Sequence, residues 1–74
     1  MKQEYKVIHP FEATEPISGA QRLFNSGEIV LCDIKQGGST LTLEVGAAFT
    51  TYFLVDRSIF EDCCKWVSRT SGSI

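Results

Sequence analysis

The sequence predicts a small, mostly antiparallel β domain with one C-terminal helix. Two patterns lead to this prediction. Residues 28–34 and 40–46 are largely apolar segments on either side of a Gly37-Gly38 pair, which is typical of a β-hairpin. Between residues 57 and 69, apolar side chains recur instead at helical spacing. The chain has 74 residues, 43% hydrophobic and 22% charged, and this composition favours a single globular domain over residues 1–74.

The central hairpin is predicted to turn at Gly37-Gly38. Two glycines can adopt the positive φ angles of a two-residue type I′ turn without steric cost. A shift of one residue would move one apolar row to the opposite face of the sheet, so the turn also predicts the register. The apolar pairs expected to face each other are Ile34 with Leu41, Cys32 with Leu43, and Val30 with Val45.

Before this hairpin, the sequence predicts a strand, a loop and a short element. Residues 5–11 alternate in polarity, and Pro10 places this strand at an edge or bends it, because proline cannot donate to a ladder. Residues 12–19 have turn chemistry and predict an ordered surface loop. Residues 20–24 fit either a helical turn or a short strand, and residues 25–27, Asn-Ser-Gly, predict the turn that ends it.

A second turn is predicted at residues 46–48, Gly-Ala-Ala. If all three residues form the loop, Phe49, Phe53 and Val55 lie on the apolar face of the preceding strand, whereas a two-residue turn would place Tyr52 and Leu54 there. We favour the three-residue loop, because it adds two phenylalanines to the core. The opposite face is then too apolar to lie wholly in water, so we expect the C-terminal segment or another subunit to cover it. Its apolar residues are Ile29, Leu31, Tyr52 and Leu54.

The predicted helix runs from about Arg57 to Arg69. Ser58 and Glu61 have the spacing of a capping box at its start. Residues 70–74 predict a flexible tail, which leaves residues 5–69 as the ordered core. The apolar positions of the helix are Ile59, Phe60, Cys63, Cys64, Trp66 and Val67.

Three segments resemble the SH3 family. The segment Val7-Ile-His-Pro-Phe-Glu-Ala-Thr14 is similar to the A-L-Y-D-Y-x-A motif of the first strand and loop entry. Leu23-Phe-Asn-Ser-Gly-Glu-Ile-Val30 resembles the L-x-F-x-x-G-D/E-x-I segment that follows the long first loop. Phe53-Leu-Val-Asp-Arg-Ser-Ile-Phe60 is loosely similar to the G-x-[FI]-P-x-N-Y stretch near the family's end. The resemblance implies a small antiparallel SH3-like, partly open barrel.

The SH3 resemblance extends only in part to the family's peptide groove. SH3 domains hold proline-rich peptides on a row of aromatic residues that includes a tryptophan early in the third strand. Phe11 stands at the second tyrosine of the first motif and Phe60 at the last tyrosine, but Trp66 lies in a different segment. Glu12 and Glu15 fall in the loop where family acids meet ligand arginines. We therefore carry over the barrel and keep SH3-type peptide binding as a further alternative.

Charge and cysteine content argue against several functions. The net charge is −2 and the seven Lys and Arg residues are scattered along the sequence. Binding to nucleic acid relies instead on Lys and Arg residues that cluster on the protein. Three cysteines without a C-x-x-C spacing do not form a disulfide framework, so we expect a reducing, cytoplasmic location. The chain has no apolar run near 18 residues and begins without an apolar leader, so we expect no membrane association.

The residues that carry chemistry have simpler structural explanations. His9 is the single histidine, and no nucleophile or second ligand stands at a recognisable spacing from it. Cys63-Cys64 fits the apolar pattern of the helix. Glu61 and Asp62 lie in a first helical turn, where acids are favoured by the helix dipole. Gly37-Gly38-Ser39 precedes a strand, whereas phosphate-binding glycine loops precede a helix. We therefore expect no enzymatic activity, no cofactor and no metal.

The function predicted from the sequence is a small non-enzymatic module for protein interaction. A chain of this length buries only about 60% of its unfolded surface, so the monomer is marginally stable and self-association into a homo-oligomer is expected. The interface is either the second apolar sheet face or the helix face with Ile59, Cys63 and Trp66. Another protein is the alternative partner. A second possibility is a small-molecule-binding or catalytic site at an oligomer seam, lined by His9, Glu12 or Tyr52. The candidate contact residues are Phe11, Glu12, Glu15, Tyr52, Phe60 and Trp66.

Overall fold

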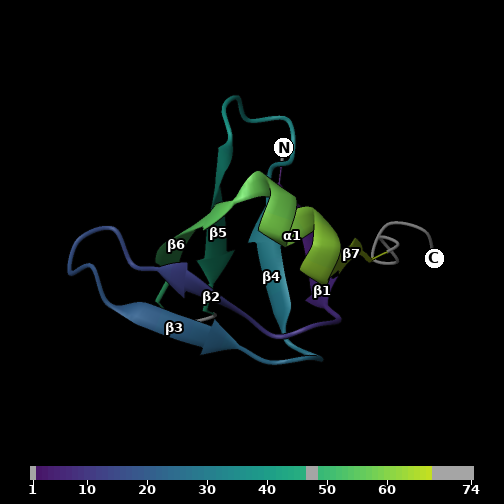
Figure 1. Ribbon diagram of the computed structural model, residues 1–74, viewed down its shortest axis with the longest axis horizontal. Helices are drawn as coiled ribbons and strands as arrows, with labels where there is room; N and C mark the ends of the chain where they lie inside the picture. The colour runs from purple at the N-terminus through teal and green to yellow at the C-terminus, as the bar shows by residue number, and fades with distance from the viewer. Residues whose placement is uncertain (1, 47–48, 68–74) are drawn as a thin grey trace.

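The computed structural model describes residues 2–46 and 49–67, which form one antiparallel sheet of seven strands and one short helix (Figure 1). The spatial order is β3-β2-β6-β5-β4-β1-β7, so β3 and β7 are the two edges. The sheet curls into an open half-barrel, which confirms the predicted fold class. The elements in chain order are β1 (Gln3–Val7), β2 (Phe11–Thr14), β3 (Gln21–Phe24), β4 (Ile29–Cys32), β5 (Thr40–Val45), β6 (Thr51–Asp56), α1 (Arg57–Cys63) and β7 (Cys64–Trp66).

The core fills the concave side of the sheet. α1 buries Phe60 there, and its ring meets the edge of Tyr5 with 4.9 Å between ring centroids. Toward β3, the ring of Phe24 stacks on Phe11 at 5.2 Å and meets Phe53 edge-on at 5.3 Å. Aromatic pairs at these distances add to the burial energy. The buried set is Tyr5, Val7, Phe11, Ala13, Phe24, Val30, Cys32, Leu41, Leu43, Phe53, Val55, Phe60 and Cys64.

The central hairpin has the predicted register but a different turn. Cys32 lies opposite Leu43, as expected. However, β4 ends at Cys32 and residues 33–39 form a longer loop, so the two-residue type I′ turn is wrong. Gln36 explains the difference, because its amide oxygen accepts the backbone N–H of Thr42 at 3.1 Å and so takes the place of a strand residue. Of the two glycines, only Gly38 has a positive φ, 90°.

The pairing of β5 with β6 confirms the predicted face and corrects the position of Phe49. Leu43 lies opposite Phe53 and both are buried. A three-residue loop would pair Val45 with Phe49. In the structure Val45 pairs with Thr51, two residues later in the chain. Phe49 therefore lies in the connection and is 85% exposed. Residues 47–48 of the predicted turn lie outside the described residues.

In the N-terminal part, the predicted strand over residues 5–11 is two strands, β1 and β2, separated at residues 8–10. β2 continues to Thr14, so the loop predicted over residues 12–19 is shorter and spans residues 15–20. Residues 21–24 form strand β3, so of the two alternatives for this segment, a helical turn or a short strand, the strand is correct. The turn at residues 25–27 is confirmed, and the backbone N–H of Glu28 donates to the Asn25 carbonyl at 3.1 Å.

The C-terminal helix is shorter than predicted. α1 ends at Cys63, and the next three residues pair with β1 as strand β7, with Trp66 opposite Tyr5. Asp56 is the N-cap and forms no side-chain capping bond, so the capping box is wrong. Arg69 and the predicted tail lie outside the described residues. No helix in the described part of the chain is long and apolar enough to cross a membrane.

Candidate functional site

The convex side of the sheet carries an apolar group that we call the outer sheet face, defined as Ile29, Leu31, Tyr52 and Leu54. Their neighbours along β4 and β6 point into the core, so alternation turns these four side chains outward. Ile29 is 47% exposed and Tyr52 48%, while Leu31 and Leu54 are half-buried. The described helix lies on the opposite, concave side. It therefore does not provide the cover that we expected from the C-terminal segment.

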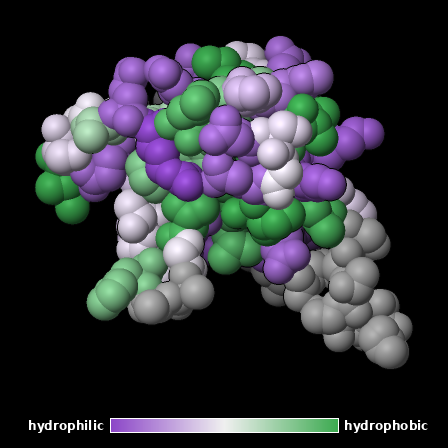
Figure 2. Space-filling model, turned by 90° about the horizontal axis from the view of Figure 1, so that it is seen from below, coloured by the Kyte–Doolittle hydropathy of each residue, from purple (hydrophilic) through white to green (hydrophobic). Residues whose placement is uncertain are grey.

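An ion pair divides the outer sheet face. Glu44 on β5 lies between Tyr52 and Leu31 in one cross-strand row. Its carboxylate is 2.6 Å from the Lys2 ammonium, and the Glu44 side chain is only 13% exposed. Figure 2 shows the molecule from below, where apolar side chains gather in a central band beneath a mostly polar upper part. Apolar side chains therefore lie on either side of a paired charge on this face.

The structure does not bring the six candidate contact residues into one site. Phe11 is 6% exposed and Phe60 1%, so neither can contact a peptide at the surface. The expectation that these two residues line an exposed groove is therefore wrong, because both complete the aromatic core. Tyr52 and Glu12 point outward from β6 and β2. Trp66 is 53% exposed at the β7 edge, on the side of the sheet that faces the core.

Glu15 has a structural role in the loop between β2 and β3. Its carboxylate accepts the backbone N–H of Ser18 at 2.7 Å and the Ser18 hydroxyl at 2.5 Å. These bonds, the hydroxyl bond first, hold the pKa of Glu15 below its usual range. The loop is closed further by the Gly19 N–H, which donates to the Glu15 carbonyl at 2.8 Å. Its tip presents Ile17, which is 93% exposed and which we did not single out from the sequence.

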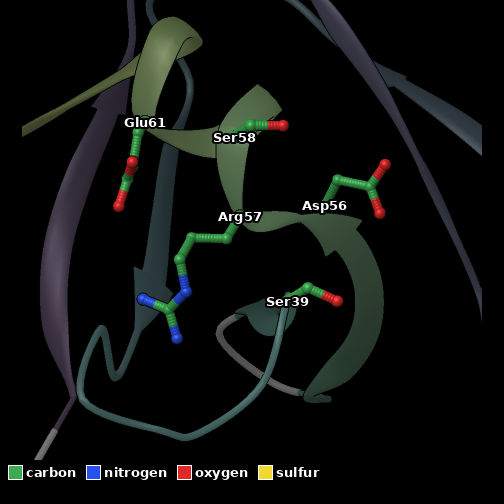
Figure 3. Close-up of a pocket in the computed structure, with 5 residues that line it drawn as sticks. All are labelled: Ser39, Asp56, Arg57, Ser58 and Glu61. Carbon is green, nitrogen blue, oxygen red and sulfur yellow. The ribbon is translucent and has the colours of Figure 1, made fainter.

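A hollow of about 440 Å³ lies where β6 meets α1 (Figure 3). Arg57 in its wall extends into the 33–39 loop, where its guanidinium donates to the carbonyls of Ile34 at 2.9 Å, Gln36 at 2.6 Å and Gly38 at 3.1 Å. Asp56 and Glu61 point in different directions (Figure 3). The guanidinium is thus engaged in holding the loop, and the hollow has no convergent pair of charges. Its lining residues are Ser39, Asp56, Arg57, Ser58 and Glu61.

The residues considered for catalysis are far from a reactive arrangement. His9 is exposed, and its backbone N–H donates to the Cys63 carbonyl at 3.2 Å. Burial raises the pKa of Cys32 to about 11 and that of Cys64 to about 12, which keeps both thiols protonated. Within residues 2–46 and 49–67, no cluster of three metal-ligating side chains is found. The hollow at Arg57 contains neither His9, Glu12 nor Tyr52.

Comparison with models of protein families, with curated proteins and with solved structures finds no match. The functional argument therefore rests on the geometry of this chain.

Proposed function

We propose that this chain is a small, SH3-like interaction module that self-associates through its outer sheet face. The observation that carries the proposal is the pair of half-exposed residues Ile29 and Tyr52 beside Leu31 and Leu54 on one side of one sheet. Removal of apolar surface from water contributes about 25 cal/mol per Å². Because the four side chains lie on β4 and β6, which both pair with β5, they form a fixed surface that loses little conformational freedom on binding.

The helix face is the second candidate surface. Ile59 is 39% exposed and Trp66 53%, so both have apolar area to bury. They lie on different elements, however, because α1 ends before Trp66 and the predicted continuous helical stripe is interrupted by β7. The outer sheet face is held by strand pairing and is the better-defined surface. Phe11 and Phe60, which were expected to line a peptide-binding groove, are buried in the core. Nothing in the described residues favours a catalytic site at an oligomer seam.

The proposal is tested by the solution mass of the protein, measured by light scattering over a concentration series at neutral pH with reductant. We expect a dimer or larger assembly, and we expect Tyr52→Lys to shift it to monomer. Lysine at this position faces Glu44 across the ladder, so the fold tolerates it. Ile59→Lys is the matched control on the helix and should leave the mass unchanged.

Circular dichroism of both variants establishes that they are folded. A wild-type protein that is monomeric at every concentration contradicts self-association. Dissociation by Ile59→Lys but not by Tyr52→Lys would move the interface to the helix face.

A further inference from the structure

The strand pairs β1–β4 and β2–β3 are the two halves of one long, bent hairpin. Lys6 lies opposite Ile29 in the first half. Phe11 lies opposite Phe24 in the second half, five residues later in one strand and five residues earlier in the other. The register is therefore the same on both sides of the bend, and no residue is inserted in either strand. Figure 1 shows how the two strands turn together between the halves, toward the bottom of the view.

The hydrogen bonds of the two halves are also in phase. In the first half, the Val7 N–H donates to the Glu28 carbonyl at 2.8 Å. Beyond the second half, the Glu15 N–H donates to the Ala20 carbonyl at 2.7 Å, which continues the same register. The two donors are eight residues apart, and hydrogen-bonded pairs of an antiparallel ladder recur at every second residue. A straight ladder could therefore run through the bend without any change of pairing.

The alternation of side chains continues across the bend as well. Tyr5 and Val7 are buried in the core before it, and Phe11 and Ala13 are buried after it. His9 falls at the position between them in the same alternation. This is the pattern from which the sequence predicts one uninterrupted strand. The sequence is therefore compatible with a straight hairpin as well as with the bent one.

The bend, which comprises residues 8–10 and 25–28, depends on one glycine. Gly27 has a φ of 100°, in the region that favours glycine, and its N–H donates to the Val7 carbonyl at 2.7 Å. Pro10 lies opposite this glycine's side of the bend and has no N–H to donate. In a straight ladder, however, the backbone at Pro10 would point away from the paired strand, so proline would interrupt no bond there.

Straightening the bend would exchange backbone hydrogen bonds with little net loss. The bonds that would be lost run from the Glu28 N–H to the Asn25 carbonyl at 3.1 Å and from the His9 N–H to the Cys63 carbonyl at 3.2 Å. In a straight ladder, His9 and Ser26 would instead exchange two backbone bonds, because they fall at a hydrogen-bonded position of the common register. The bent and straight forms thus differ little in backbone bonding.

Beyond the bend, the β2–β3 hairpin is joined to the rest of the sheet mainly by packing. In the described part of the chain, β2 and β6 form a single ladder pair, Thr14 with Leu54, whereas β5 and β6 form six. The contact in the core is larger, because the Phe24 ring meets Phe53 edge-on at 5.3 Å. The hairpin is therefore a unit that can leave and rebind without disturbing other strand pairs.

We propose that the β2–β3 hairpin exchanges between two copies of this chain. The bend of each copy straightens, and its hairpin packs on β6 of the other copy, where Phe24 of one chain meets Phe53 of the second. A second copy is the partner because the surface at β6 fits this hairpin, and the exchange restores every contact that the separation removes. Exchange of an identical element is a low-cost route to a dimer. This route does not depend on the outer sheet face.

Gly27→Val is the variant that tests the exchange. No atom lies within 4 Å of a Cβ added at Gly27, so valine is strained there only by the φ of the bent form. In the straight ladder this position is extended, where valine is favoured. Such strain shifts the equilibrium by about tenfold per chain, so the dissociation constant of a dimer of two chains should fall about a hundredfold.

Gly19→Val is the matched control. Gly19 has a φ of 77° and equally open surroundings, but it lies in the loop between β2 and β3, which the exchange leaves unchanged. Valine there should lower the stability of the monomer and of the exchanged dimer alike. The variant should therefore leave the dissociation constant unchanged.

All variants carry Tyr52→Lys, so that the outer sheet face does not contribute to the mass. Each is unfolded in urea and refolded at about 1 µM and about 1 mM, because a tethered segment has an effective concentration of about 1 mM. Sedimentation equilibrium gives the mass. Isotope-filtered NMR on a mixture of differently labelled chains, refolded together, shows whether Phe24 contacts Phe53 between chains. Both rings are buried, so a dimer through the sheet face cannot give this signal.

At the higher concentration we expect Gly27→Val to refold as a dimer with contacts between Phe24 and Phe53 of different chains, and Gly19→Val to remain a monomer. The inference is overturned if Gly27→Val stays monomeric, if its dimer lacks these contacts, or if Gly19→Val dimerises equally well. It is also overturned if Gly27→Val folds at neither concentration, because the exchanged form carries no strain at this residue. The chain with Tyr52 intact tests the outer sheet face separately, so either proposal can fail without the other.

Discussion

Replacement of Arg57 by methionine should loosen the 33–39 loop and lower the stability of the whole domain. The guanidinium donates to three carbonyls of this loop, at Ile34, Gln36 and Gly38. The backbone N–H of Arg57 also donates to Ser39 at 2.8 Å, and this bond survives the substitution. Methionine retains most of the apolar stem, so the change removes chiefly the three side-chain bonds.

The expected loss follows from these bonds. A hydrogen bond contributes about 1 kcal/mol net, and bonds from a charged donor about 1.5–3 kcal/mol. The loop is partly open to water, which can hydrate the released carbonyls. We therefore take about 1 kcal/mol for each bond and expect a loss of about 3 kcal/mol for the three bonds. A domain of this size has a free energy of unfolding of about 4–11 kcal/mol. The substitution therefore removes a large fraction of the total.

Urea unfolding followed by Trp66 fluorescence measures the change in stability. Hydrogen exchange locates it, because the Lys35 N–H donates to the Asp33 carboxylate and the Thr42 N–H to Gln36 within the pinned loop. Both amides should exchange faster in the variant. Lys35→Met is the control, since it removes a positive charge from the same loop without touching the three carbonyl bonds.

A loss below about 0.5 kcal/mol, within the range of ordinary surface substitutions, together with unchanged exchange at Lys35 and Thr42, would refute the role assigned to Arg57. An equal loss in Lys35→Met would show that net charge, rather than the three bonds, stabilises the loop.

Two further predictions concern titration. With thiolate fractions near 10⁻³ and 10⁻⁴ at pH 8, Cys32 and Cys64 should resist an aromatic disulfide reagent in the folded protein; fast reaction of more than one thiol per chain contradicts their burial. The pKa of Glu28 is lowered, first by the Asn25 N–H at 2.8 Å and then by Arg22 at 2.8 Å. The Glu28 carboxylate stabilises the fold above its ordinary pKa of 4.5, and this contribution is lost as pH falls through its lower folded-state pKa. The free energy of unfolding of Glu28→Gln should therefore fall less steeply with decreasing pH than that of wild type. Equal slopes contradict this role.

The sequence determined the strand faces better than the connections between strands. Alternation placed Cys32 opposite Leu43 and put Phe53 in the core, because a one-residue slip would expose an apolar row. The same alternation cannot tell a two-residue turn from the 33–39 loop. That loop depends on Gln36 and Arg57, whose partners are carbonyls and N–H groups with no signature in the sequence.

The C-terminal error has a different physical origin. Residues 57–67 have helical periodicity, but Cys64 and Trp66 also fit the alternation of a strand. β1 has a second edge whose backbone groups need partners, and this requirement overrides helix propensity after Cys63. Lys6 and Lys65 face each other because of this pairing, so no local pattern predicts their contact. The exposed outer sheet face was predictable, since it depends only on the alternation within β4 and β6.

The position of β1 in the sheet has a consequence for how the chain folds. Both of its neighbours come later in the chain, and Tyr5 meets Trp66 about sixty residues away. To form contacts of such long sequence separation, the chain must lose the entropy of closing a long loop before the contacts stabilise it. We therefore expect folding in milliseconds to seconds rather than microseconds. During synthesis, one edge of β1 can pair with β4 once residue 32 has been made, but the other edge must wait for β7, until nearly every described residue has been made. Until then this second edge is free to pair with other nascent chains, and the vulnerable stage of this small protein precedes its last strand.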